Sequence, residues 1–256
     1  MLTDLAEACR KSGLRVVELD GWRTRRSAGG EAYRGVLCHH TGSYDDIGDT
    51  DSDLSYALWM ARTGRPDLDP PLCNLALSAE GVVYVAAAGN ANHAGQAKAS
   101  GPMPAAADGN ALYIGIEAMN SGSQGWSRLG RDDRGKAVTQ YDAYVRLCAA
   151  LCKHYGWPAS HVRAHRETSV TGKWDPGLLE MTSFRADVAR EIRGDDDDMP
   201  AYSEWPEKDR KALADDVAKA VLDADMNAHE PKGDEDFRGV SLRQVVKRIA
   251  RAVGKE

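Results

Sequence analysis

The chain has 256 residues, of which 42% are hydrophobic and 28% charged, and its formal net charge is −6. This composition is typical of a globular protein with one substantial domain and an appendage. The acidic balance, without a basic patch interleaved with aromatic residues, argues against nucleic acid as a partner. The five cysteines are odd in number and form no CxxC pair, which favours reduced thiols over a disulfide framework.

The first residues of the chain lack a basic segment followed by an apolar segment, so we expect no secretory signal. No run of 18 apolar residues occurs, so we expect no membrane span. Both features predict a protein that is made in the cytoplasm.

Periodicity and breaker residues predict helices alternating with strands along the first 193 residues. The Asp-rich and Gly-rich residues 45–53 are predicted as a solvated loop, because the ligand spacing of an EF-hand is absent. Alternating elements of this kind indicate an α/β fold, in which a central mixed β-sheet is flanked by helices. In chain order we expect a helix at 3–12, strands at 14–19 and 35–40, a helix at 54–62, a hairpin of strands 72–77 and 81–86, a strand at 111–118, a helix at 138–155, a short strand around Val162 and a helix at about 178–193.

The acidity is concentrated near the end of the chain, where residues from Gly194 onward include 16 acidic and 11 basic residues. The run Asp195–Asp198 cannot fold on itself and predicts a linker. The domain organisation that we expect is a catalytic domain over 1–193, an acidic linker over 194–204 and a small helical region over 205–256. The amphipathic helix expected near 242–253 suits self-association, wall-polymer binding or contact with an anionic membrane surface.

Candidate metal ligands lie in a short segment that is closed by Pro176-Gly177. Within it, His165 and Asp175 are residue types that bind zinc, but a catalytic zinc site needs three protein ligands. The best source of a third ligand is the His39-His40 pair at the end of a buried apolar strand.

A second arrangement of ligands is also conceivable. His161 and His165 are spaced i,i+4 and would share one face of a helix, as in a helical zinc motif. Pro158 and Val162 argue against a helix there, so this alternative is less favoured.

Five separated motifs occur in a family-specific order over about residues 30 to 180. The motifs are His39-His40-Thr41-Gly42, the segment 74–84, Ala91-Asn92-His93-Ala94-Gly95, Ile114-Gly115-Ile116-Glu117-Ala118 and the segment 165–176. Together they resemble the zinc-dependent N-acetylmuramoyl-L-alanine amidases, the family that includes the peptidoglycan recognition proteins, and most closely the phage endolysins that attack actinobacterial walls.

This resemblance implies a zinc ion bound by His39, His165 and Asp175. Some relatives have a cysteine in the last position, whereas the cytosolic recycling branch has aspartate. Two imidazoles and one carboxylate leave a zinc site with a net charge of about +1, which favours ionisation of a bound water. The same resemblance implies that Glu117 is the general base and that Lys173 stabilises the oxyanion.

Four further residues are assigned to substrate binding. His40 is a neighbour of the first ligand, and His93 is expected to line the substrate groove, although a structural hydrogen bond is the alternative. Asn74 and Cys73 belong to the hairpin motif. Cys73 stands where some relatives have a catalytic tyrosine, and a thiol cannot replace a phenol.

The function that these features imply is that of an endolysin. It would hydrolyse the amide between N-acetylmuramic acid and L-alanine of bacterial peptidoglycan, and it would reach the cell wall with the help of a holin. Two alternatives remain open, which are a non-catalytic peptidoglycan-binding protein of the same fold and a cytosolic amidase that recycles soluble muropeptides.

Overall fold

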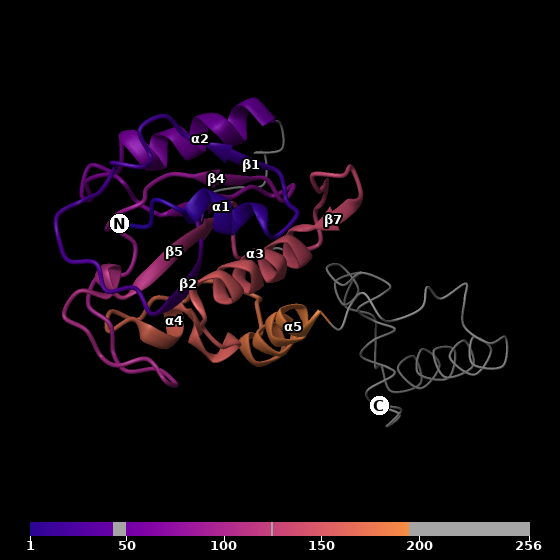
Figure 1. Ribbon diagram of the computed structural model, residues 1–256. Helices are drawn as coiled ribbons and strands as arrows, with labels where there is room; N and C mark the ends of the chain where they lie inside the picture. The colour runs from indigo at the N-terminus through magenta and orange to yellow at the C-terminus, as the bar shows by residue number, and fades with distance from the viewer. Residues whose placement is uncertain (43–49, 124, 195–256) are drawn as a thin grey trace, which may run out of the picture. The chain divides into compact units, whose positions relative to one another are not determined.

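A mixed β-sheet forms the centre of the computed structural model, which describes residues 1–42, 50–123 and 125–194 (Figure 1). In these residues six strands pair in the order β1-β4-β3-β5-β2-β8. β3 and β4 pair antiparallel, whereas the other neighbours in the sheet are parallel. The strands are β1 (Val16–Glu18), β2 (Gly35–His40), β3 (Leu75–Leu77), β4 (Val83–Val85), β5 (Tyr113–Ala118) and β8 (Val162–Ala164).

Helices cover both faces of this sheet. In Figure 1, α2 lies above the strands, and the adjacent helices α3 and α5 lie below them. The predicted α/β fold with a flanked mixed sheet is therefore confirmed. The helices are α1 (Leu5–Arg10), α2 (Thr50–Arg62), α3 (Gln140–Tyr155), α4 (His165–Thr168) and α5 (Met181–Arg193), with short 3-10 turns at Gly109–Ala111 and Ala159–His161.

Alternation along the strands sorts their side chains between two hydrophobic clusters. Leu75 and Leu77 of β3 pack in the cluster that contains α1, α3 and α5. Ala76 between them packs in the cluster formed with α2. All three strand residues are buried, because each face of the sheet is covered.

The long helix α3 has a capping group at each end. The Thr139 side chain accepts a hydrogen bond from the Asp142 N–H, and Gly156 ends the helix in the left-handed region at φ 73°. Its apolar residues recur at helical spacing and pack against the sheet and against α5. This helix supports the strand that carries His39, since Tyr144 reaches the end of β2.

Several boundaries differ from the prediction. The α2 helix begins at Thr50, one turn before the expected start at Leu54, because the apolar periodicity on which the prediction rested starts only at Leu54. The region before α3 forms a hairpin of β6 (Leu129–Arg131) and β7 (Ala137–Thr139), which periodicity did not predict because each strand has only three residues, too few to show an alternating pattern. The α3 helix accordingly begins at Gln140.

Other expectations concern the rest of the chain. The five cysteines are free thiols and all are buried. No helix in the described residues is long and apolar enough to cross a membrane. The predicted linker at 194–204, apart from Gly194, and the predicted helical region at 205–256 lie outside the described residues.

Candidate metal centre and active site

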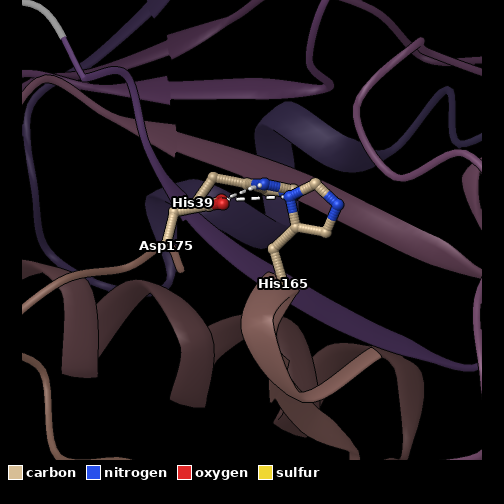
Figure 2. Close-up of side chains that lie close together, drawn as sticks. All are labelled: His39, His165 and Asp175. Atoms are coloured by element: carbon tan, nitrogen blue, oxygen red, sulfur yellow. Dashed lines mark hydrogen bonds and ion pairs between the residues drawn. The ribbon is translucent and has the colours of Figure 1, made fainter. Parts of the chain in front are cut away.

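Three side chains from distant parts of the chain converge at one end of the sheet (Figure 2). His39 lies near the end of β2, His165 is the first residue of α4, and Asp175 lies in the segment before α5. The Nδ1 atoms of His39 and His165 lie 2.9 and 3.1 Å from the same carboxylate oxygen, Oδ2 of Asp175. The three residues assigned as ligands from the sequence are thus brought together.

This cluster can hold a divalent metal. One ligand atom from each residue lies within 4.8 Å of the others, and all three residues are buried. Two imidazole nitrogens and one carboxylate oxygen form a donor set that suits zinc. Three protein ligands leave the fourth position of a tetrahedral zinc ion for water or substrate. The residues present therefore fit the metal that the sequence motifs imply.

The ionisation of these groups also suits metal binding. Burial lowers the pKa of His39 to about 4, so its imidazole is neutral at pH 7. Burial disfavours ionisation of Asp175, but hydrogen bonds from His165 and His39 outweigh it and lower the pKa of this carboxyl. Metal ligation requires neutral imidazole and ionised carboxylate, and these are the forms of His39 and Asp175 at neutral pH.

Glu117 lies beside the cluster because of strand register. It is the pairing partner of His39 across the parallel strands β5 and β2, and its Oε1 lies 3.8 Å from the His39 Nδ1. Burial, with a further contribution from the Asp175 charge, raises the pKa of Glu117 well above its usual range. A carboxyl group with a raised pKa can exchange protons near neutral pH.

Lys173 and Trp174 lie in the segment that leads to Asp175, and both are exposed. The positive charge of Lys173 acts on Glu117, where it opposes the rise in pKa. The Trp174 ring packs edge-on against His40, with the ring centroids 4.3 Å apart. The segment before Asp175 thus brings a cation whose charge acts on Glu117 and an exposed aromatic side chain that packs on His40.

Arg166 anchors the segment that carries Asp175. Its backbone N–H donates to the Asp175 carbonyl at 2.9 Å. Its guanidinium donates to the carbonyls of Pro176 and Leu179. Because Arg166 follows His165 directly, these bonds link the positions of two ligands, His165 and Asp175.

His40 also contacts this segment. Its Nδ1 accepts a hydrogen bond from the Gly177 N–H at 2.8 Å, and the Trp126 indole donates to the Gly177 carbonyl at 3.0 Å. Burial lowers the pKa of His40, consistent with an unprotonated acceptor nitrogen. A contact between His40 and substrate stays a prediction.

The remaining substrate-binding assignments fall on buried residues. Asn74 is fully buried, and its side chain accepts from the Gly115 N–H and donates to the carbonyls of Ala87 and Gly89. Cys73 is also fully buried, and it belongs to the cluster under α2. Both residues lie in the protein core, and their roles in substrate binding stay predictions.

His93 is buried as well, and it contacts a ligand directly. Its Nδ1 lies 3.1 Å from the His39 Nε2, and the two rings meet edge-on with centroids 5.2 Å apart. The structural hydrogen bond that was the alternative for His93 is therefore present. The structure also separates His161 from His165, since His161 ends a 3-10 turn and its Nδ1 bonds to the Arg34 carbonyl.

Sequence analysis did not identify three residues that support this site. These are Arg166, Tyr144 and Asn110. The Tyr144 hydroxyl accepts from the His39 N–H and lies within hydrogen-bond distance of the His39 and Ile116 carbonyls. Asn110 Oδ1 accepts from the backbone N–H groups of His93 and Ala94. Each acts through backbone groups that meet only in the folded chain, so no local pattern marks it.

The fold and the site together define a class of α/β protein with a buried His-His-Asp metal centre and an adjacent carboxyl group. The family model described as N-acetylmuramoyl-L-alanine amidase (Amidase_2) matches residues 29–178. This match spans more than half of the chain and includes His39, Glu117 and Asp175. The chain belongs to the N-acetylmuramoyl-L-alanine amidase family, which supports a hydrolase acting on peptidoglycan.

Two solved structures are similar to this chain at low sequence identity. The endolysin N-acetylmuramoyl-L-alanine amidase LysCS from Clostridium intestinale URNW is 14% identical, with a TM-score of 0.37, over 68% of this chain and 95% of that one. A selenomethionine derivative of AmpD is 18% identical, with a TM-score of 0.42, over 68% of this chain and 94% of that one. No curated protein matches the chain.

Proposed function

We propose that this protein is a zinc-dependent amidase of the endolysin type. It hydrolyses the amide between the lactyl group of N-acetylmuramic acid and the L-alanine of the stem peptide. The observation that carries this proposal is the convergence of His39 Nδ1, His165 Nδ1 and Asp175 Oδ2, with Glu117 beside them, inside the segment that matches the amidase family.

In this proposal His39, His165 and Asp175 hold the zinc ion. A bound zinc would polarise the scissile carbonyl and lower the pKa of a water molecule toward neutrality. The protein contributes the three ligands at one end of the sheet. Arg166 holds the segment that carries Asp175 in place. Burial of the ligands keeps competing solvent away from the centre.

Glu117 moves the proton. Its carboxylate takes a proton from the attacking water and then delivers it to the leaving nitrogen of L-alanine, so that the amine departs in a neutral form. The raised pKa of Glu117 suits both steps, because the group must accept a proton and then release it near neutral pH. Its rigid position on β5 keeps the carboxylate beside the ligand His39.

Lys173 stabilises charge on the carbonyl oxygen. Attack on the amide places negative charge on that oxygen, and an ammonium group nearby lowers the energy of this state. Lys173 lies two residues before Asp175 in an exposed segment, and its charge already acts on Glu117. These two features support the assignment of Lys173 to the carbonyl oxygen.

The endolysin type is favoured over a recycling amidase by two features. The Asn92-His93-Ala94-Gly95 motif resembles endolysin amidases, and residues 179–256 extend beyond the family match. A recycling enzyme that acts on small soluble muropeptides does not need such an extension. If the protein is an endolysin, a holin gives it access to the cell wall, and its C-terminal region binds a wall polymer or a second copy of the chain.

The test is to incubate the full-length protein with purified peptidoglycan and with soluble anhydromuropeptides, and to follow the products by mass spectrometry. We expect release of free stem peptide from peptidoglycan, loss of this activity with a chelator, and recovery with Zn²⁺. Asp175→Ala should abolish both the activity and stoichiometric zinc binding, whereas the exposed-site control Asp20→Asn should retain both.

Other outcomes would point elsewhere. Cleavage of soluble anhydromuropeptides without cleavage of peptidoglycan would support a recycling amidase. Stoichiometric zinc without any cleavage would support a peptidoglycan-binding protein, with the buried thiol of Cys73 as the first position to examine. Cleavage that persists after complete removal of metal would overturn the mechanism.

A further inference from the structure

The imidazole of His39 has a partner on each of its two nitrogens. On one side Nδ1 faces Asp175 Oδ2 at 2.9 Å, and on the other Nε2 faces the His93 Nδ1 at 3.1 Å. All three residues are buried. The orientation of the His39 ring is therefore set from both edges.

The roles of the nitrogens follow from the chemistry of a neutral imidazole, which has one donor and one acceptor. The His39 nitrogen that shares the metal centre with His165 and Asp175 is Nδ1, and metal binding requires its lone pair. Nε2 of His39 must then carry the proton. Nδ1 of His93 lies at hydrogen-bond distance from this nitrogen, so it would have to be the unprotonated nitrogen of the His93 ring in order to accept the proton.

The ring of His93 lies against a position where the sheet has no side chain. A Cβ atom added to Gly115, in the middle of β5, would lie 2.4 Å from Cγ and Cδ2 of His93 and 2.6 Å from its Nδ1. Gly115 lies two residues before Glu117, so it faces the same side of the sheet as the active site. A glycine inside a strand is a mark of such close approach.

The backbone of His93 is held in place by hydrogen bonds that do not involve His39. Asn110 Oδ1 accepts hydrogen bonds from the N–H groups of His93 at 2.9 Å and Ala94 at 2.6 Å. Gly115 in turn is fixed by Asn74, whose Oδ1 accepts the Gly115 N–H at 2.9 Å. The position of the His93 ring is thus set by its own loop and by the strand beneath it.

We propose that His93 is a positioning residue for the metal ligand His39, and that Gly115 provides the space in which it does so. His93 accepts the Nε2 proton of His39 and thereby holds Nδ1 toward Asp175. In many metal sites a carboxylate or a backbone carbonyl has this role, and loss of such a partner weakens metal binding about 10- to 100-fold. This inference rests on the proposed metal centre.

The experiment compares zinc affinity in full-length variants, by competition with a chromophoric chelator. His93→Leu removes the acceptor and should raise the Kd for Zn²⁺ by about 10- to 100-fold. His93→Asn has nearly the same shape as the leucine variant but keeps an acceptor oxygen, and it should recover most of the affinity. Gly115→Ala should weaken zinc binding like His93→Leu, whereas Gly30→Ala, where an added Cβ meets no atom within 4 Å, should not.

The thermal unfolding of each metal-free variant shows whether it folds. Equal zinc affinities for folded His93→Leu and His93→Asn would overturn the inference. A wild-type protein that binds no zinc would overturn the proposed centre itself, and with it this inference, so the two failures are distinguishable.

A second measurement needs no variant. Imidazole nitrogen NMR of the zinc-loaded wild-type protein should show His93 with its proton on Nε2 and with an unprotonated Nδ1 that accepts a hydrogen bond. A proton on Nδ1 of His93 in the loaded protein would overturn the inference, because that nitrogen could not then accept from His39.

Discussion

Glu117 is the register partner of His39 in adjacent parallel strands, and the two side chains lie 3.8 Å apart between Oε1 and Nδ1. Residues paired in this way point to the same face of a sheet. The distance between the proposed base and the proposed first ligand is therefore determined by backbone pairing of β2 and β5. This distance does not depend on the conformation of a loop.

This relationship predicts that metal binding and proton transfer can be separated. Glu117→Gln keeps the shape of the side chain but removes its ability to take a proton. We expect kcat to fall by about 100- to 10,000-fold, the range that general acid–base groups contribute. Zinc affinity, measured by chelator competition, should fall much less than for loss of a hydrogen-bond partner of a ligand, since Glu117 neither binds the metal in this proposal nor lies within hydrogen-bond distance of His39.

The matched control for this change is Glu7→Gln, at an exposed position far along the chain from the motifs. A Glu117→Gln variant with full activity would exclude Glu117 as the base. A variant that loses zinc together with activity would instead make Glu117 part of the metal centre.

Lys173→Met removes a charge near the substrate without changing the metal ligands. We expect kcat to fall by about 100- to 1,000-fold, as for the loss of one oxyanion donor. Lys173→Arg keeps the charge and should recover part of the rate. The control is Lys98→Met at another exposed lysine, and an unchanged kcat in Lys173→Met would contradict the role in oxyanion stabilisation.

Arg166→Lys tests whether the arginine anchors the Asp175 segment. Lysine keeps the charge but cannot donate to two carbonyls in the fork geometry of a guanidinium. We expect the Kd for zinc to rise by about 10- to 100-fold, while the exposed control Arg34→Lys leaves it unchanged. Unchanged zinc affinity in Arg166→Lys would show that the segment is held in place by its other contacts, to His40 and Trp126.

Glu180 predicts a pH dependence of stability. It precedes α5, and its carboxylate accepts hydrogen bonds from the N–H groups of Thr182 and Ser183, which lower its pKa to about 2. A lowered pKa in the folded state stabilises the fold fully above the unfolded value of about 4.3. This contribution is lost as the pH falls through the folded value of about 2.

Glu180→Ala should therefore lower the free energy of unfolding by about 0.5–2 kcal/mol at pH 7, as for loss of an N-cap. Urea unfolding of both proteins at several pH values between 7 and 3 measures the difference, which should shrink as the pH falls below about 4. A difference that stays constant over this range would show that the charge of Glu180 does not contribute.

Local patterns in the sequence were sufficient for much of the fold. The apolar run at 35–40, the hairpin around Ser78–Gly81 and the helix that ends at Gly156 each depend on neighbours in the chain, and each is present in the structure. The β6–β7 hairpin was missed because its two strands have three residues each, which is too short for an apolar alternation to be recognised.

In the candidate site, too, some features follow from local sequence patterns and others only from the folded chain. Its candidate ligands carry chemistry in their side chains, so residue type and order selected His165, Asp175 and the His39-His40 pair, and the family resemblance selected His39 from that pair. The contact of His93 with His39 depends on space left by Gly115 on another strand, which sequence spacing does not encode. The glycine inside the Ile114-Gly115-Ile116 run was the available signal, because such a glycine indicates close approach of another group.

The separation of the ligands along the chain has a consequence for folding. His39 and Asp175 are 136 residues apart in sequence, yet they lie in direct contact. A bound ion would act as a cross-link that closes most of the domain into a loop, and such a cross-link disfavours the unfolded chain more strongly as the loop lengthens. The ligands meet only after β2, β8 and the Asp175 segment have assembled, so metal uptake would report that the domain has finished folding, and metal loss would leave it more open to proteolysis.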